Sequence, residues 1–597
     1  MVASAKGQPA AAPGAPTDRP PATAARQAPG WLGRAWGAPL AVHALVLLLI
    51  MAGVAALIGT GASFTDDEGA GILQARAIEA GHWTMADPLP KADPTGAAYP
   101  VNLPSRGTKG TAPLAKHLLY FVLLAALDRL FGPPGMVGLS IAGTVAAALL
   151  AARLAREFGS GLERPAFWVV GLASPLFFDG FLVVAHTAAA ALVAASVLLG
   201  LSYLRTGGLL ALAGTGLAAT SAALLRTEGL LWCAGLAAGA AVVGLSDRRL
   251  RSMLRPGMLL VASLGAGFVA HEVDVRLSDY AIGAAGSATS VSNLPSGIAS
   301  SGVSHQIQAL WQSWFQVDGN RPVAVSVAAL LVLLAVVAWA ELARRGRAGS
   351  RACVAVAGAV AALSVFLVAE RPSQYVSGIA VVFPLLWAGL WLLGHQALGS
   401  TAGRLVAASA AVYGVLVALT QYSDEGSWQN GRYFFLAIPA VVPLVMGGLV
   451  GQLKRLSGPS GRIVLALVVV SVAALTSSAV SALNTTHRLS SAMTAAVRRL
   501  GPAVPAGDGG RPVFITTAAF LPREQWPTFE STRWLLIPGG QLRSYGPSLR
   551  AAGIHQLVLV TDRGDQEIGQ LADIFAPLNS RPLAAQPAWH LVVLRSR

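Results

Sequence analysis

The chain has 597 residues, of which 54% are hydrophobic and only 12% charged. With a mean hydropathy of +0.59, it is too apolar for a soluble protein and too long for a single membrane span. The formal net charge of +15 agrees with arginines in cytoplasmic loops close to phosphate-bearing lipids, and no segment resembles a nucleic-acid-binding module. These properties predict a polytopic α-helical membrane protein in contact with a lipid bilayer, with no nucleic acid as a partner.

The first part of the chain, residues 1–38, is predicted to be a disordered cytoplasmic tail, because an Ala/Pro-rich stretch with scattered charge cannot bury a core. Residues 39–60 then form an apolar segment long enough to cross roughly 30 Å of hydrocarbon. This segment starts too far into the chain to be a cleaved signal peptide. It is therefore predicted to be the first membrane span.

Further apolar segments follow it and bring the total to about thirteen spans within residues 39–482. Cys233 and Cys353 lie in such runs and are predicted to be buried thiols. The segments cover residues 136–154, 165–178, 181–203, 208–225, 228–245, 257–273, 323–342, 351–369, 376–396, 403–421, 433–451 and 462–482.

Arginine clusters orient these spans, because short cytoplasmic loops are rich in Lys and Arg. The spans alternate correctly only if residues 113–131, which contain several charged side chains, form a helix along the membrane surface instead of crossing. We therefore predict a multi-pass plasma (inner) membrane protein with a cytoplasmic N-terminus and a long outer loop over residues 61–135. The clusters used are Arg153, Arg156 and Arg164; Arg248, Arg249, Arg251 and Arg255; Arg344, Arg345 and Arg347; and Lys454 with Arg455.

The pattern changes after residue 482, where apolar residues alternate with polar ones, as in strands. Strands are predicted over residues 512–520, 556–562 and 589–596, with helices over 548–554 and 566–575. Residues 483–597 are thus predicted to be an extracytoplasmic α/β domain, with the parallel sheet that such spacing favours. Because it lacks a glycine-rich phosphate loop, no nucleotide site is predicted there.

Three consecutive acids, Asp66, Asp67 and Glu68, follow Thr65 where the first span ends. Thr-x-x-Glu has the spacing of a helix capping box, and carboxylates are favoured near a helix N-terminus. A cap does not need three acids, however, and a carboxylate partly screened from water has a raised pKa and can act as a general base. Both interpretations, a cap and a catalytic base, stay open from the sequence.

The same outer loop contains Lys109, Lys116 and His117, which are candidates for binding a phosphate headgroup. The alternative for each is a side chain that merely reaches to the lipid headgroups. Two polar residues near the next spans, Asp179 and His186, are expected on the same outer side, although a single histidine in an apolar span more often only packs.

Arginines also occur at outer turns, where they are normally rare, so each is expected to be ion-paired or to bind an anion. Neighbouring glutamates, Glu228 and Glu370, permit the ion-paired interpretation for two of them, whereas the third has no adjacent acid, although Asp424 and Glu425 are close. The three arginines are Arg226, Arg371 and Arg432.

Several of these features together resemble the GT-C glycosyltransferases that use polyprenyl-phosphate sugars, of which protein O-mannosyltransferases and aminoarabinose transferases (family 39-like) are examples. The resemblance covers residues 39–482 and comprises about thirteen spans and three local motifs. These are Asp67-Glu68 after the first span, Pro113-Leu114-Ala115-Lys116 at the surface helix, and Gly431-Arg432-Tyr433 at the start of a late span.

The resemblance implies a cell-envelope glycosyltransferase that moves a hexosyl or pentosyl group, with inversion, from a polyprenyl-monophosphate sugar to a hydroxyl of a glycan, lipid or protein acceptor. Asp67 is then the general base, with Asp66 and Glu68 beside it. Lys116, His117 and Arg432 stabilise the leaving phosphate, and Tyr433 is a further site residue. No metal site and no required cofactor are predicted, although a divalent cation bridging Asp66 or Glu68 to the phosphate is left open.

Two functions from other classes remain as alternatives. A transporter or flippase of a lipid-linked or anionic substrate would also use intramembrane charge. The absence of an internal repeat, and of paired Gly/Pro-interrupted spans, argues against it. A binding or scaffold protein acting through residues 483–597 is the second alternative.

Overall fold

The computed structural model describes most of the chain after its N-terminal tail. It divides into Met1–His43 and Ala44–Arg597, and the first part contributes only residues 38–43, so the predicted tail lies outside the described residues. The description covers residues 38–597 apart from 103, 247–249, 284–303, 305–306, 309, 312, 316–321, 346–348, 371–377, 392–397, 421–430, 457, 505–509, 538 and 584–585.

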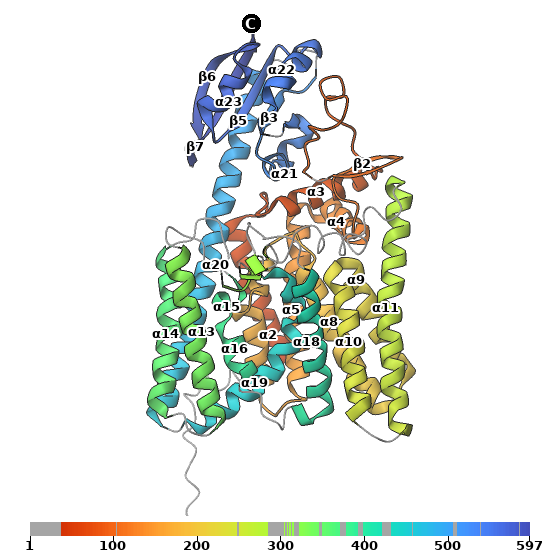
Figure 1. The fold of residues 1–597 in the computed structure, drawn as a ribbon, viewed down its shortest axis with the longest axis vertical. Coiled ribbons are helices and arrows are strands. Elements are labelled where there is room, and N and C mark those ends of the chain that lie inside the picture. The colour runs from red at the N-terminus through yellow and green to blue at the C-terminus, as the bar shows by residue number, and fades with distance from the viewer. Residues whose placement is uncertain are drawn as a thin grey trace, which may run out of the picture. The chain divides into compact units, whose positions relative to one another are not determined.

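Long apolar helices make up most of residues 44–482 (Figure 1). Eight helices in the described part of the chain are long and apolar enough to cross a membrane, and two shorter ones, Leu209–Leu225 and Ser350–Phe366, are apolar as well. Leu57, Leu210 and Phe268 project from them as large exposed apolar side chains, as expected of helices whose outer faces contact lipid. The predicted class of a polytopic membrane protein is confirmed, while the number of about thirteen spans stays a prediction.

The helices of this bundle follow one another along the chain, with the outer loop between α2 and α5. In order they are α2 (Leu40–Ile58), α5 (Pro133–Ala155), α6 (Glu163–Trp168), the π-helix η1 (Val169–Ala173), α7 (Leu176–Asp179), α8 (His186–Thr206), α9 (Leu209–Leu225), α10 (Thr227–Ser246), α11 (Leu250–Ile282), α13 (Pro322–Arg344), α14 (Ser350–Glu370), α15 (Ile379–Val382), α16 (Pro384–Trp391), α18 (Thr401–Thr420), the 3₁₀-helix η2 (Arg432–Ala437), α19 (Ile438–Arg455) and α20 (Pro459–Leu500).

Two predicted spans are interrupted helices in the structure. Residues 165–178 are divided among α6, η1 and α7, with Ser174 in an extended conformation before Pro175. Residues 379–391 are divided into α15 and α16 at Phe383, which precedes Pro384. A residue before proline is driven away from the helical conformation, so both prolines explain interruptions that hydropathy alone does not reveal.

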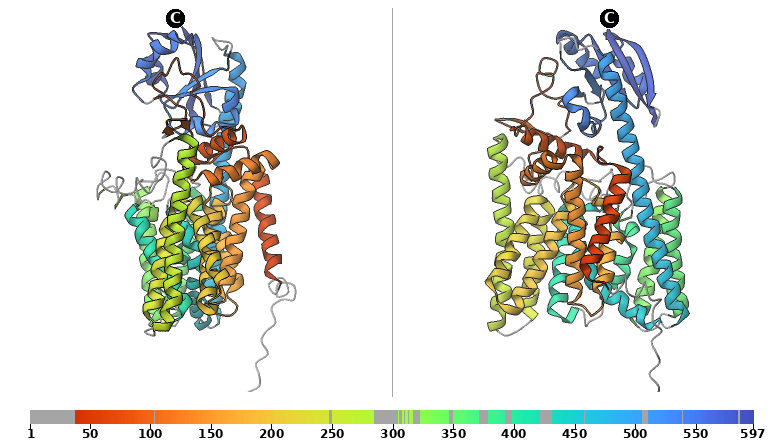
Figure 2. Two further views of the ribbon diagram at one scale, coloured as in Figure 1. Left: turned by 90° about the vertical axis from the view of Figure 1, so that its right-hand side faces the viewer. Right: turned by 180° about the vertical axis from the view of Figure 1, so that it is seen from behind.

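Two 14-residue helices, α3 (Asp66–Glu79) and α4 (Leu118–Phe131), lie at one end of the bundle (Figures 1 and 2). Each is about 21 Å long, which is too short to cross the hydrocarbon core. α4 buries Tyr120 and Leu124 and exposes Leu123, which agrees with the prediction that residues 113–131 do not cross. Between them, β1 (Ser105–Gly107) pairs with β2 (Gly110–Ala112). We call this end of the bundle the polar end.

The C-terminal residues form a five-stranded sheet in the order β4-β3-β5-β7-β6. The first three strands of this order are parallel, whereas β7 is antiparallel to both β5 and β6. The predicted parallel arrangement is therefore wrong at one side of the sheet, because β6 and β7 follow each other without the crossover helix that a parallel pair needs. The elements are β3 (Val513–Thr516), α21 (Leu521–Glu524), the 3₁₀-helix η4 (Trp526–Ser531), β4 (Arg533–Leu536), α22 (Leu542–Ala551), β5 (Gln556–Thr561), α23 (Gly564–Leu571), β6 (Phe575–Leu583) and β7 (Gln586–Ser596).

The bundle and the sheet are joined by α20, which has 42 residues. Such a helix is about 63 Å long, roughly twice the hydrocarbon thickness. Its last turns extend beyond the polar end (Figure 2), where Met493 and Val497 pack with Phe514 and Val558 against one face of the sheet. The predicted domain boundary at residue 482 thus lies inside a continuous helix, after which a short 3₁₀ turn (Gly501–Ala503) ends it.

The outer loop also contributes to the C-terminal core. Leu89, Ala92 and Ala98 are buried with the apolar residues on the other face of the sheet. The Leu536 amide at the end of β4 donates to the Ala98 carbonyl at 3.0 Å, and the Tyr545 hydroxyl donates to Asp93 Oδ1 at 3.3 Å. The C-terminal domain therefore includes part of the loop that was predicted to belong to the membrane domain.

Candidate active site at the polar end of the bundle

The three acids begin helix α3, and the predicted capping box is present. Thr65 Oγ1 accepts from the Glu68 amide at 3.1 Å, and Glu68 Oε2 accepts from the Thr65 amide at 2.9 Å. Glu68 Oε2 also accepts from the Phe64 amide at 2.8 Å, while Oε1 accepts from the Val183 amide at 2.6 Å. Both oxygens of Glu68 are thus occupied by backbone donors.

Glu68 is almost completely buried. Burial raises the pKa of its carboxyl to about 7, even though the backbone hydrogen bonds act in the opposite direction. Glu68 therefore links the start of α3 to the turn before α8, and we call this link the clamp. Asp66 is the first residue of α3, and its side chain lies outside what the structure describes.

Asp67 differs from Glu68 because half of its side-chain surface is exposed. Its Oδ2 lies 3.2 Å from Arg432 Nη1, so the two form an ion pair. Removal from bulk water raises the pKa of Asp67, but the charges of Arg432, Lys116, Arg523 and Arg226 outweigh it and hold the pKa at about 2. The raised pKa expected from burial is therefore wrong in sign for this residue, since cations surround it.

The backbone before Arg432 directs its side chain toward Asp67. Gly431 has φ of 80°, in the left-handed region, and a Cβ atom there would lie 2.8 Å from the Ser313 carbonyl oxygen, so only glycine fits. The Arg432 guanidinium lies 5.4 Å from the centre of the Tyr433 ring. The Tyr433 carbonyl in turn accepts a hydrogen bond from Tyr413.

Arg226 lies between α9 and α10 and is ion-paired. Its Nη2 and Nε bind the two oxygens of Glu228 at 2.7 and 3.0 Å, which is the two-pronged geometry that arginine favours with carboxylates. Of the two interpretations left open by the sequence, the structure thus supports the paired one. Glu370 ends α14, but Arg371 lies outside the described residues.

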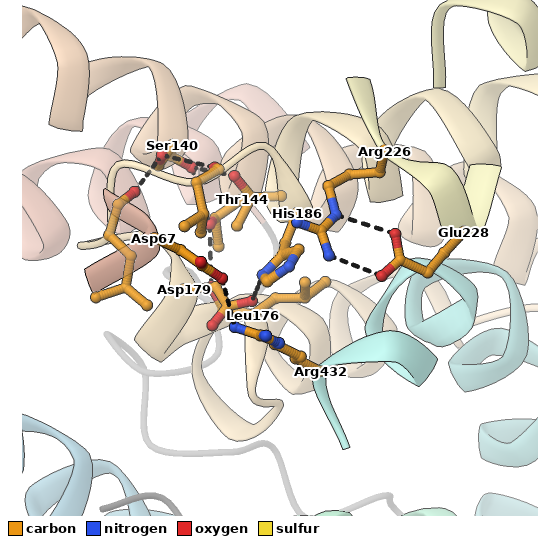
Figure 3. Close-up of polar contacts among 12 residues, drawn as sticks. Asp67, Ser140, Thr144, Leu176, Asp179, His186, Arg226, Glu228 and Arg432 are labelled. Carbon is orange, nitrogen blue, oxygen red and sulfur yellow. Dashed lines mark hydrogen bonds and ion pairs between the residues drawn. The ribbon is translucent and has the colours of Figure 1, made fainter. Parts of the chain in front are cut away.

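Asp179 and His186 form a buried pair beside these arginines. Their Oδ2 and Nδ1 atoms are 2.8 Å apart, and both side chains are shielded from solvent. Figure 3 shows the His186 ring between Arg226 and Arg432, and both arginines interact electrostatically with it. The structure therefore brings together Asp67, Arg432, Asp179 and His186, which lie far apart in the sequence.

The segment formed by α7, which ends at Asp179, and the turn after it is fastened to α5. Thr144 Oγ1 donates to the Leu176 carbonyl at 3.1 Å, and Ser140 Oγ donates to the Leu182 carbonyl at 2.5 Å (Figure 3). Irregular backbone near membrane depth persists only where its polar groups are satisfied. Ser140, Thr144 and Glu68 supply those partners, so the turn is held in a defined position.

His117 is not a cationic phosphate ligand in this structure. It precedes α4 with φ of 59°, and its amide donates to Asp274 Oδ1 at 2.9 Å. Its Nε2 lies 3.0 Å from Thr227 Oγ1. Burial, together with the charges of Lys116 and Arg226, lowers the pKa of His117 to about 3. The ring is neutral and connects α4 to α10, which corrects the predicted phosphate role.

The two candidate lysines, Lys109 and Lys116, have different surroundings. Lys109 Nζ donates to the Tyr280 carbonyl at 2.9 Å and lies over the Tyr280 ring. It therefore caps the end of α11, and it is not among the cations that act on Asp67. Lys116 is half-buried and lies close enough to Asp67 to lower its pKa. Of the two, only Lys116 is placed where the predicted phosphate role requires it.

A further cation comes from the C-terminal domain and is absent from the sequence-based prediction. Arg523 in α21 is one of the four cations that lower the pKa of Asp67, and it is buried. Nothing in the sequence Leu521-Pro522-Arg523-Glu524 distinguishes it from a surface turn. Ser140 and Thr144 were also missed, although two hydroxyl residues four positions apart in an apolar span are a recognisable signal.

No group of three or more His, Cys, Asp and Glu residues that could hold a metal ion occurs within the described residues. Cys233 and Cys353 are buried and unpaired with each other, as predicted.

No protein-family model and no curated protein matches the sequence. Among solved structures, the chain is similar to ArnT from Cupriavidus metallidurans bound to undecaprenyl phosphate, with a TM-score of 0.49 and 12% identity over 95% of this chain and 98% of that one. The apo state of the same ArnT gives a TM-score of 0.48 and 11% identity over 94% and 98% of the two chains. The apo oligosaccharyltransferase of Archaeoglobus fulgidus gives 0.45 and 11% over 87% and 69%.

Proposed function

We propose that this protein is a membrane glycosyltransferase that moves a sugar, with inversion, from a polyprenyl-monophosphate donor to an acceptor hydroxyl outside the cytoplasm. The observation that carries the proposal is Asp67, a half-exposed carboxylate paired with Arg432 and surrounded by cations at the polar end of a membrane bundle. A transferase of this kind needs both parts, a base for the acceptor and positive charge for the phosphate.

Several cations gather around one half-exposed acid. Arg226 is paired with Glu228, but Arg432, Lys116 and Arg523 all act on the single carboxylate of Asp67. Such a group of cations favours an anion, and Arg and Lys are the side chains that bind phosphate. The same groups stabilise the charge that develops on the phosphate as it leaves.

Donor binding also strengthens the base. A carboxylate with a pKa of about 2 is a weak base near neutral pH, because general bases act best when their pKa is close to the working pH. A bound phosphate offsets the charges of Arg432 and Lys116 and so raises the pKa of Asp67. Asp67 thus becomes an effective base only when the donor is in place.

The reaction then proceeds in one displacement. The acceptor oxygen attacks the anomeric carbon on the face opposite the phosphate while Asp67 accepts the hydroxyl proton. The bond between that carbon and the phosphate oxygen breaks, and the phosphate leaves with the electron pair. General-base help of this kind contributes roughly 10²- to 10⁴-fold. Inversion at the anomeric carbon follows from a single displacement.

The other predicted residues take supporting roles in this proposal. Glu68 and the pair Asp179–His186 position α3 and the adjoining turn, and Tyr433 packs against the Arg432 guanidinium. No cofactor is required. A divalent cation bridging Asp66 to the phosphate is the alternative, and Glu68 is unsuited to that task because both of its oxygens accept backbone hydrogen bonds.

Arginine distribution supports an extracytoplasmic polar end. Arg153, Arg205 and Arg344 lie in the last turns of α5, α8 and α13, and all three helices run away from the polar end (Figure 1). By the positive-inside rule the opposite end is then cytoplasmic. We therefore propose a plasma-membrane protein whose N-terminus is cytoplasmic and whose C-terminal domain is extracytoplasmic.

The test is a transfer assay in vesicles with a panel of hexosyl and pentosyl polyprenyl monophosphates. Wild-type protein is expected to form product with at least one donor, Asp67→Asn to be nearly inactive, and the exposed control Asp573→Asn to be unaffected. The anomeric configuration of the product, read by NMR, tests inversion. Movement of the donor across the bilayer without product would instead identify a flippase and contradict the proposal.

A further inference from the structure

We propose that the C-terminal domain completes the reaction centre, by docking α21 on the first turns of α3 and supplying Arg523 as a ligand of the donor phosphate. This inference rests on the proposed function, because it takes the donor to be a polyprenyl monophosphate. It assigns a role to residues in which the sequence shows no motif.

The docking contact is a close approach of two backbones. A Cβ atom built on Gly69 would lie 2.2 Å from the Arg523 carbonyl oxygen and 2.5 Å from its carbonyl carbon. Any side chain at residue 69 would therefore displace α21, since the obstacle is backbone and not a flexible side chain. Gly69 follows Asp67 by two positions, so the contact brings Arg523 to the turn that carries the acid.

A second contact fixes the same segment further along α3. The Arg76 guanidinium lies 4.5 Å from the Trp526 ring centre and its Nε lies 3.3 Å from Asp128 Oδ2. Trp526 follows α21 directly, at the start of η4. Two contacts, at Gly69 and at Arg76, therefore hold residues 523–526 along the middle of α3.

The charge of Arg523 is held close to the acid. Only 6% of the residue is exposed, and a buried guanidinium is costly unless anionic groups compensate it. Its charge reaches Asp67, together with those of Arg432 and Lys116. A donor phosphate bound beside Asp67 would lie next to these cations, between the membrane domain and the C-terminal domain.

The first test measures binding of a polyprenyl monophosphate without sugar to the full chain in nanodiscs. Arg523→Gln is expected to raise the Kd about 10- to 100-fold, the loss typical of one charge-assisted hydrogen bond. Arg523→Lys should recover part of the affinity, and the exposed control Arg581→Gln should leave the Kd unchanged. If Arg523→Lys binds no better than Arg523→Gln, the charge is not the cause and the proposal is overturned.

The docking contact has its own matched pair. Gly69→Ala is expected to weaken binding as Arg523→Gln does, because its methyl group displaces α21. Gly61→Ala is the control, since no atom lies within 4 Å of a Cβ there. Equal Kd values for Gly69→Ala and wild type would contradict the docking role.

A pH profile separates a charge effect from a folding effect. Loss of Arg523 removes one of the charges that lower the pKa of Asp67, so the acid limb of kcat/KM should move to higher pH in Arg523→Gln and stay in place in Arg581→Gln. Wild-type protein that binds no polyprenyl monophosphate would overturn the proposed function. Wild-type binding with an unchanged Kd in Arg523→Gln would overturn this inference alone.

Discussion

Two neighbouring acids, Asp67 and Glu68, have opposite electrostatic surroundings. Glu68 points into the protein, where burial raises its pKa to about 7. Asp67 points toward Arg432 and its pKa is about 2. A difference this large between adjacent residues arises because helical geometry directs successive side chains about 100° apart. One acid therefore holds the helix, while the other is half-exposed beside Arg432.

Replacement of Asp67 by asparagine tests the base. Asp67→Asn should lower kcat by roughly 10²- to 10⁴-fold, because the amide cannot accept the acceptor proton. The protein should stay folded, since the residue is half-exposed and the capping box uses only Thr65 and Glu68. Initial transfer rates, with the thermal unfolding temperature as a folding control, measure both effects, and wild-type turnover would refute the role.

The pH dependence tests the ion pair with Arg432. Because the pKa of Asp67 is about 2 in the free protein, Asp67 is ionised over the whole physiological range and should produce no loss of kcat/KM as the pH falls from 7 to 5. Arg432→Gln removes the strongest neighbouring positive charge, so the pKa should rise and the acid limb should move to higher pH. An unshifted limb in that variant would show that Asp67 does not titrate in this profile.

At the scale of secondary structure, the site depends on how α3 is attached to the bundle. Glu68 joins the start of α3 to Val183, and Ser140 and Thr144 of α5 hold the same irregular turn. Hydropathy predicted the positions of most long helices because a span needs about twenty apolar residues wherever it occurs. It did not reveal the interruptions at Ser174 and Phe383, since these depend on prolines and on partners in other helices.

Glu68→Gln is expected to destabilise the protein by about 1–3 kcal/mol, because one carboxylate oxygen is replaced by an amide NH₂ that faces a backbone N–H. The pH dependence has a definite sign. The folded pKa of about 7 lies above the ordinary value of 4.5, so the folded state binds more protons, and the free energy of unfolding falls as the pH rises through this window.

The variant should therefore lose this part of the pH slope. Thermal unfolding at pH 5 and pH 8, compared with the exposed control Glu530→Gln, measures the difference. An unchanged unfolding temperature at both pH values would show that the clamp contributes nothing.

At the scale of the whole molecule, the outer loop and the C-terminal region form a single core. Leu89, Ala92 and Ala98 are buried with residues of the sheet, and α20 passes without a break from the bundle into this core. A domain boundary read from hydropathy marks where a span ends, but it does not mark where a core ends. The scaffold alternative assigns the function to residues 483–597 alone. Those residues, however, are only part of one folded unit.

Expression of residues 483–597 alone should yield an unstable fragment, because its sheet lacks the loop residues that cover it. Leu89→Ala in the full chain should cost about 2–5 kcal/mol of stability, as buried leucine truncations do. The exposed Leu578→Ala is the control. Circular dichroism and thermal unfolding measure both, and a fragment as stable as the full chain's domain would contradict the shared core.

The sequence by itself determined the class of the molecule, the helix within residues 113–131 that is too short to cross, the capping box and the acids that begin α3. These features depend on runs of neighbouring residues, and local patterns record them. Only the tertiary structure decided which charges meet, because Asp67 and Arg432 are 365 positions apart. The tertiary structure places Arg523 among the cations near Asp67 and places Lys109 and His117 elsewhere, and the pKa of Asp67 is low for this reason. Sequence reasoning cannot find this arrangement, because electrostatic energy depends on distance in space and not on separation along the chain.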